Sequence, residues 1–85
     1  MTNFVDTYKN LTELEKHIFH RFHDDILRNG TCWTNIGIRT PNEKGALGSL
    51  VKKQLLVFQE TDSEGYELYS SALIKEDGGN YTSII

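Results

Sequence analysis

The chain has 85 residues, of which 12 are acidic and 9 basic, and its formal net charge is −3. This length predicts a single domain with a small core, and the acidic balance disfavours a protein that binds polyanions without selectivity. Its single cysteine excludes an intramolecular disulfide and a cysteine-based zinc finger, and we expect a reducing, cytoplasmic setting. No apolar run approaches the roughly 18–20 residues that span a bilayer, and the first residues do not resemble a signal peptide.

Residues 1–11 are expected to form a polar lead-in whose aromatic residues, Phe4 and Tyr8, fold back onto the core. The first strong element is a helix over 12–28. Thr12 and Glu15 have the spacing of a capping box, in which each side chain accepts a hydrogen bond from the other residue's backbone. The apolar residues of this segment share one stripe of the predicted helix: Leu14, Ile18, Phe19, Phe22 and Ile26. Asn29-Gly30 is expected to end it.

Residues 31–39 fit either a short helix or a short strand, with Trp33, Ile36 and Ile38 expected to be buried. A second helix is predicted over 41–53. Thr40 stands at its N-cap, Pro41 at its first position and Glu43 at the third, which repeats the capping-box pattern.

Two apolar segments, 55–58 and 66–69, flank a loop rich in turn residues and predict a β-hairpin. Residues 70–76 fit either an extension of the second strand or a short helix. Asp77-Gly78-Gly79-Asn80 is expected to end regular structure. We therefore assign one α+β domain to residues 12–76 and a flexible C-terminal tail to residues 77–85.

The succession of helix, short element, helix and hairpin resembles a winged helix-turn-helix domain. The stretch Lys44-Gly-Ala-Leu-Gly-Ser-Leu-Val-Lys-Lys-Gln-Leu-Leu-Val-Phe carries the likeness. It is similar to the recognition helix and first wing strand of small bacterial and bacteriophage DNA-binding regulators. The resemblance covers about residues 12–69. It implies a transcriptional regulator that inserts helix 41–53 in the major groove of double-stranded DNA, in some cases as a dimer that reads two half-sites.

The distribution of charge agrees with that expectation in the middle of the chain. Residues 39–53 hold four bases and one acid, whereas residues 54–85 hold one base and six acids. The resemblance assigns DNA contacts to residues at the start and along the open face of the second helix: Arg39, Thr40, Lys44, Ser49, Lys52 and Lys53. Lysine can contact phosphate or guanine edges there, and a helix N-terminus can bind phosphate. The alternative is that these lysines only keep an exposed helix soluble.

The predicted hairpin departs from the pattern of DNA-binding wings, which usually carry Lys or Arg. It carries four acids and no base: Glu60, Asp62, Glu64 and Glu67. Carboxylates repel phosphates, most strongly at low salt. An alternative function is therefore a winged-helix module that binds a basic protein surface through the hairpin and does not bind DNA.

Three histidines share the first helix, and we expect His17, His20 and His23 to lie opposite the apolar stripe, exposed, with Glu13–His17 and His20–Asp24 as modest ion pairs. Two of them could bind zinc from one face, but no second ligand motif accompanies them, so no metal is predicted. Cys32 is expected to be a small buried apolar residue. No catalytic constellation or phosphate loop is present, and we predict neither enzymatic activity nor a cofactor.

Overall fold

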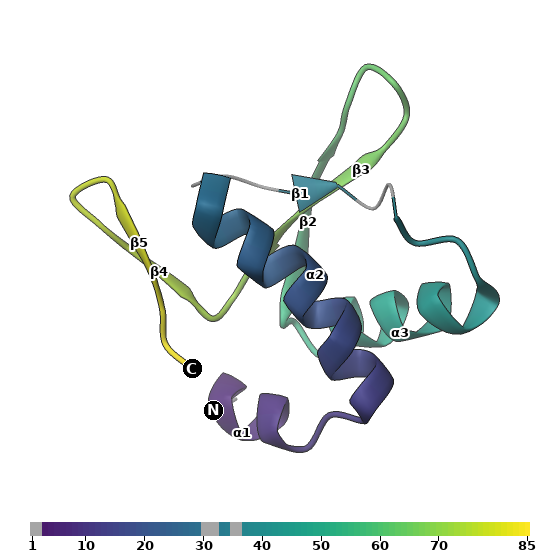
Figure 1. The fold of residues 1–85 in the computed structure, drawn as a ribbon, viewed down its shortest axis with the longest axis horizontal. Helices are drawn as coiled ribbons and strands as arrows, with labels where there is room; N and C mark the ends of the chain where they lie inside the picture. Colours follow the sequence, from purple (N-terminus) through teal and green to yellow (C-terminus); the bar gives the residue numbers. More distant parts are fainter. Residues whose placement is uncertain (1–2, 30–32, 35–36) are drawn as a thin grey trace.

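The computed structural model describes residues 3–29, 33–34 and 37–85 of the chain. These residues form a small α+β fold in which two antiparallel hairpins accompany three helices (Figure 1). The helices are α1 (Phe4–Lys9), α2 (Glu13–Asn29) and α3 (Pro41–Lys52), and the strands are β1 (Trp33–Thr34), β2 (Leu56–Thr61), β3 (Glu67–Ser71), β4 (Ile74–Asp77) and β5 (Asn80–Ser83). The predicted α+β class is confirmed at this level.

The N-terminal segment is a helix where the sequence suggested only a polar lead-in. Asn3 caps α1, since its side-chain oxygen accepts hydrogen bonds from the backbone N–H groups of Val5 and Asp6. Phe4, Val5 and Tyr8 pack against the core. The expectation that the two aromatic residues fold back onto the core is therefore confirmed.

Both predicted capping boxes are present. The Thr12 N–H donates to Glu15 Oε1 at 3.0 Å, and the Glu15 N–H donates to Thr12 Oγ1 at 3.2 Å. Thr40 and Glu43 make the same reciprocal pair at the start of α3, with Pro41 at the first helical position. These local hydrogen bonds explain why the starts of both helices are readable from sequence. The predicted end at Gly30 lies outside the described residues.

A Schellman motif ends α3 and turns the chain into β2. The Leu55 N–H donates to the Leu50 carbonyl oxygen at 3.0 Å, and the Gln54 N–H donates to the Val51 carbonyl oxygen at 3.0 Å. Leu50 and Leu55 are both fully buried. They occupy the two positions whose side chains form the apolar pair that frequently accompanies this motif. Gln54 has φ 64°, in the left-handed region that favours glycine.

The predicted hairpin is confirmed as β2 and β3, with a loop that begins after Thr61 and ends before Glu67. Its three-stranded sheet has the order β1-β3-β2, and all neighbours are antiparallel. The register pairs Phe58 with Tyr69 and shifts between Phe58 and Glu60, where a β-bulge interrupts the ladder. Of the two alternatives for residues 31–39, the structure has a strand at 33–34; residues 31, 32, 35 and 36 lie outside the described residues.

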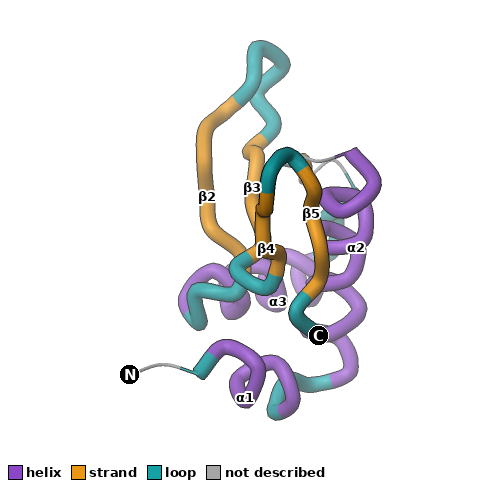
Figure 2. The backbone as a smooth tube through the Cα atoms, turned by 90° about the vertical axis from the view of Figure 1, so that its left-hand side faces the viewer, coloured by secondary structure: helices purple, strands orange, loops and turns teal. Residues whose placement is uncertain are grey.

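The prediction that residues 77–80 end regular structure is wrong. Asp77 and Asn80 pair across a tight turn, and β4 and β5 form a second hairpin that projects away from the first (Figures 1 and 2). Gly78 and Gly79 have φ values of 60° and 87°, which a two-residue type I′ turn requires at both positions. The residues that signal a break are therefore the ones that connect two strands. Of the alternatives for residues 70–76, the strand extends to Ser71 before a short turn.

The core lies between α2, α3 and the inner face of the first hairpin. Its largest fully buried side chains are Phe19, Phe22, Ile18, Leu50, Leu55, Leu56 and Leu73, together with His23. The predicted stripe of α2 is confirmed at Ile18, Phe19, Phe22 and Ile26, but Leu14 is 40% exposed. Leu14 and His23 stand at the two borders of the stripe, each about 90° from its centre. At such borders the neighbouring elements decide which side chain is covered.

Replacing Gln54 by Gly is expected to raise the free energy of unfolding by about 0.5–1 kcal/mol, because glycine adopts the left-handed conformation without a Cβ clash. Urea unfolding followed by circular dichroism measures the change. Gln54→Ala is the matched control, since it removes the same side chain and keeps the steric penalty. An equal gain in both variants would contradict the explanation.

Candidate nucleic-acid interface

One long side of α3 faces solvent. Ala46, Leu47 and Leu50 are buried against the core, whereas Lys44, Gly45, Gly48 and Lys52 are exposed. A Cβ built on either glycine meets no atom within 4 Å. Packing within the chain therefore gives no reason for glycine at these positions, although each glycine costs the helix about 0.5–1 kcal/mol relative to alanine.

The start of α3 is occupied by its own cap. Glu43 Oε1 accepts hydrogen bonds from the N–H groups of Thr40 and Arg39 at 3.0 and 3.3 Å, and its Oε2 accepts one from Arg21 Nη1 at 2.9 Å. Hydrogen bonds from the Thr40 backbone and side chain, and from the Arg39 backbone, hold the pKa of Glu43 below its usual value. A carboxylate already sits where a phosphate was expected, and Thr40 Oγ1 accepts from the Glu43 N–H. Arg39 is exposed beside this cap.

Two of the predicted DNA contacts, Ser49 and Lys53, are turned toward α2. Ser49 Oγ donates to Glu15 Oε2 at 2.6 Å, and Lys53 Nζ donates to the same oxygen at 2.7 Å. Burial alone would raise the pKa of Glu15, but the hydrogen bonds from Lys53, Ser49 and Thr12 outweigh it and lower that pKa to about 2. The structure therefore leaves Arg39, Lys44 and Lys52 exposed and turns Ser49 and Lys53 toward α2.

The acids of the alternative, protein-binding hypothesis lie on and near the hairpin tip. Glu60 and Glu64 are exposed. The Asp62 carboxylate accepts hydrogen bonds from the backbone N–H groups of Glu64 and Tyr66, both at 2.9 Å, and so stabilises the loop. Glu67 is half-buried beside Tyr69, where burial and the neighbouring Glu67 charge raise the pKa of the tyrosine.

A shallow groove of about 410 Å³ separates α3 from β3. Its lining residues are Ile38, Lys44, Leu47, Gly48, Val51, Glu67 and Tyr69. Lys44 and Glu67 give the groove one charge of each sign, and the other lining groups are largely apolar. The groove therefore makes the open side of α3 continuous with the first hairpin.

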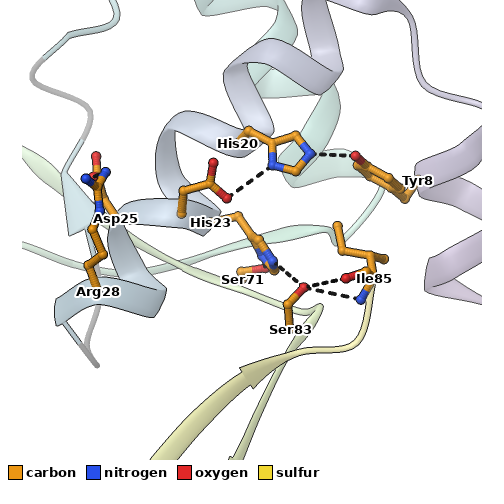
Figure 3. Close-up of polar contacts among 9 residues, drawn as sticks. Tyr8, His20, His23, Asp25, Arg28, Ser71, Ser83 and Ile85 are labelled. Atoms are coloured by element: carbon orange, nitrogen blue, oxygen red, sulfur yellow. Dashed lines mark hydrogen bonds and ion pairs between the residues drawn. The ribbon is translucent and has the colours of Figure 1, made fainter.

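Sequence reasoning placed all three histidines on the exposed face of α2, and this is wrong for His23, which is 1% exposed. Its Nδ1 lies 2.7 Å from Ser71 Oγ and its Nε2 lies 2.9 Å from Ser83 Oγ (Figure 3). The second contact ties the C-terminal hairpin to α2. The two serine hydroxyl groups replace the water that an exposed imidazole would bind, so both ring nitrogens keep hydrogen-bond partners although the ring is buried.

The hydrogen-bond pattern around His23 fits a neutral ring. Ser83 Oγ donates to the Ile85 carbonyl oxygen at 3.1 Å, so it accepts from His23 Nε2–H. Ser71 Oγ accepts from the Leu73 N–H at 3.2 Å and is free to donate its own proton to Nδ1. Burial lowers the pKa of His23; Asp24 raises it and His20 lowers it further.

His20 is half-buried between two partners. Its Nδ1 lies 3.2 Å from Asp24 Oδ1, which confirms the expected i, i+4 pair, and its Nε2 lies within hydrogen-bond distance of the Tyr8 hydroxyl (Figure 3). The Tyr8 contact fastens α1 to α2. Among the described residues, no three His, Cys, Asp or Glu side chains come together in a way that could hold a metal ion, and Cys32 lies outside them.

Sequence reasoning missed the second role of Glu15 and the burial of His23. Glu15 was assigned only to a helix cap, yet it precedes Ile18, Phe19 and Phe22 by three, four and seven residues. This spacing places it on the apolar stripe, which was the available signal that its carboxylate needs buried partners. His23 follows Phe19 by four residues, which gave a similar signal at the border of the stripe.

Comparison of the chain with protein-family models, with curated proteins and with solved structures gives no match. In the described part of the chain, no helix combines the length and apolar character needed to cross a membrane. The functional interpretation therefore rests on the geometry of the exposed surfaces.

Replacing Glu15 by Gln is expected to lower the free energy of unfolding by about 1–3 kcal/mol, because Lys53 loses its charged acceptor in a buried cluster. Since the folded-state pKa is about 2 against an ordinary 4.5, the wild-type contribution is complete above pH 4.5 and declines toward pH 2. Urea unfolding at a series of pH values measures this. Glu13→Gln, an exposed change in the same helical turn, is the control, and an equal loss there would contradict the assignment.

Acidification is expected to destabilise the protein through His23. Its folded-state pKa lies below 6.5, so the unfolded chain takes up a proton first and the free energy of unfolding falls as pH drops below about 6.5. In the His23→Gln variant, the midpoint temperature of thermal unfolding should depend less on pH across this range. The control variant His17→Gln, at an exposed position, should keep the wild-type dependence of that midpoint on pH. If the His23→Gln variant kept the wild-type dependence of the thermal midpoint on pH, His23 would be excluded as the titrating group.

Proposed function

We propose that the chain is a winged-helix module that binds double-stranded DNA, with α3 in the major groove and β2–β3 as the wing. The order of α2, β1, α3 and the first hairpin is compatible with that fold. The short β1 pairs with β3, and α3 leads into β2 through a tight turn. This arrangement of helices and strands supports the winged-helix part of the proposal.

The observation that carries the proposal is the exposed face of α3, where two glycines without a packing reason lie between Lys44 and Lys52. Removing side chains from a helix face lets another molecule approach the backbone closely. The two lysines select a polyanion as that molecule, because each can neutralise a phosphate and release a counterion. Arg39 adds a third exposed cation at the start of the segment.

The acidic hairpin limits how the DNA is oriented. Glu60 and Glu64 are exposed near its tip and would repel the phosphate backbone. DNA is therefore proposed to contact the exposed face of α3 from Lys44 to Lys52, with the tip of the hairpin directed away from the duplex. Because Ser49 and Lys53 bind Glu15, the contacts reduce to Arg39, Lys44 and Lys52, and binding should be weak and strongly dependent on salt.

The second candidate function is protein binding through the first hairpin. It is favoured by the exposed acids Glu60 and Glu64 on a hairpin that carries no base and by the exposed side chains of Val57 and Phe58 on the same strand. An acidic tip next to apolar side chains suits a partner with a basic rim around an apolar centre.

Fluorescence anisotropy with a labelled mixed-sequence duplex tests the DNA proposal at about 50 and 200 mM salt. Lys44→Ala is expected to weaken binding at low salt and to reduce the slope of log K against log salt by about one. Lys75→Ala, which removes the same charge from the exposed surface of β4, is the control and should leave both quantities unchanged.

The same titration with Gly48→Ala separates function from folding. Alanine should stabilise the helix by about 0.5–1 kcal/mol, as measured by thermal unfolding, and weaken DNA binding through its added methyl group. No binding of the wild-type chain at 50 mM salt would overturn the DNA proposal and leave the protein-binding alternative.

A further inference from the structure

The outer edge of the three-stranded sheet is β2, which has β3 on one side and, among the described strands, none on the other (Figure 2). Two consecutive large apolar residues of this strand, Val57 and Phe58, are 42% and 46% exposed. A free edge presents unpaired backbone donors and acceptors. When a second strand pairs with that edge, it also covers the exposed apolar side chains, which is favourable.

A groove of about 320 Å³ continues from this edge toward α1 and the end of α3. Its lining residues are Phe4, Val51, Gln54, Leu56, Val57, Phe58 and Ala72. None of these side chains is charged, so the groove favours apolar groups from an incoming strand.

The part of β2 that is open to pairing is short. The β-bulge between Phe58 and Glu60 interrupts the regular ladder, and Glu60 is the first charge on the strand. Before the bulge, Leu56–Phe58 contains neither the proline nor the lysine that usually protects an edge. These three residues are therefore where a new strand can add.

The charges at the two ends of this stretch differ in sign. Lys52 is exposed just before the turn into β2, and Glu60 and Glu64 are exposed beyond the bulge. Consider an antiparallel strand that also has a basic residue before it and an acidic residue after it. Its acidic end would lie toward Lys52 and its basic end toward Glu60. A second copy of this chain meets that description, and twofold symmetry then forms each contact twice.

We propose that two copies of the chain associate by antiparallel pairing of their β2 strands at Leu56–Phe58, which buries Val57 and Phe58 and sets Lys52 of each copy near Glu60 of the other. With Val57 opposite Val57 of the second copy, the backbone of Phe58 pairs with the backbone of Leu56. Lys52, at the end of α3, then lies on the side of the paired strands toward which the other copy carries Glu60. Lys44 lies about 12 Å along α3 from Lys52, so the start of that helix stays uncovered. Lys52 is also a proposed DNA contact, so the two associations share this side chain, and the dimer is therefore tested in the absence of DNA.

Sedimentation velocity without DNA, at protein concentrations from about 10 to 500 µM, tests the proposal. We expect a reversible dimer with a Kd of about 10–100 µM, since the contact area is small. Val57→Lys should weaken it by at least about tenfold. Lys52→Glu and Glu60→Lys should each weaken it about fivefold, and the two together should restore the dimer to within about twofold of wild type. Lys75→Glu on β4 is the charge control and should have no effect.

The two charge variants lie at exposed positions, so they remain informative if Val57→Lys does not fold, and thermal unfolding checks each variant. A monomer at all concentrations overturns the proposal, as does a dimer that survives both Val57→Lys and the single charge reversals. A dimer that the double reversal does not restore overturns the antiparallel arrangement. Nuclear Overhauser contacts between differently labelled copies, from the Val57 methyl groups of one copy to those of the other, would support it directly.

Discussion

A single buried carboxylate joins the two long helices. Glu15 Oε1 accepts the capping hydrogen bond of α2, and its Oε2 accepts hydrogen bonds from both Ser49 and Lys53. Removing such a charge from water is favourable only when its oxygens keep their partners, so this cluster constrains how α2 and α3 meet. Leu55, two residues after Lys53, is fully buried at the start of the hairpin.

That constraint also determines what α3 can offer to a partner. The side that holds Ser49 faces Glu15, and the side that holds Ala46, Leu47 and Leu50 is buried. What remains is a narrow strip of lysine and glycine. The strip is basic although the chain as a whole carries a net charge of −3, because residues 39–53 hold four bases and one acid. Local sign, and not total charge, decides which molecule can approach this helix.

Side-chain hydrogen bonds also fasten the ends of the described chain to α2. Tyr8 of α1 meets His20, and Ser83 of β5 meets His23, one helical turn further along (Figure 3). A domain of this size buries only a modest part of its surface, so such polar ties supplement the apolar core. They differ in character, because the His23 ring is enclosed and neutral, while His20 also contacts the exposed carboxylate of Asp24.

Sequence by itself determined the features that depend on neighbours within about four residues. The capping boxes at Thr12 and Thr40 could be predicted without knowledge of distant contacts, and so could the hairpin at 55–69, whose two apolar segments flank a loop of turn residues. The structure contains all three features. The Gly78-Gly79 turn was also a local signal, but two glycines fit a chain break as well as a hairpin. The pairing of β4 with β5 settled the choice.

The tertiary structure alone decided what lies at the borders of a helix stripe and which polar side chains turn inward. Leu14 and His23 stand at similar angles from the centre of the α2 stripe, yet the histidine is buried and the leucine is 40% exposed. The C-terminal hairpin covers one border and leaves Leu14 at the other. Likewise, the sequence does not distinguish Lys53 from Lys52. In the structure Lys53 binds Glu15, which lies 38 residues away in the sequence. A helical period fixes a direction around the axis, but only the packing of distant segments fixes what occupies that direction.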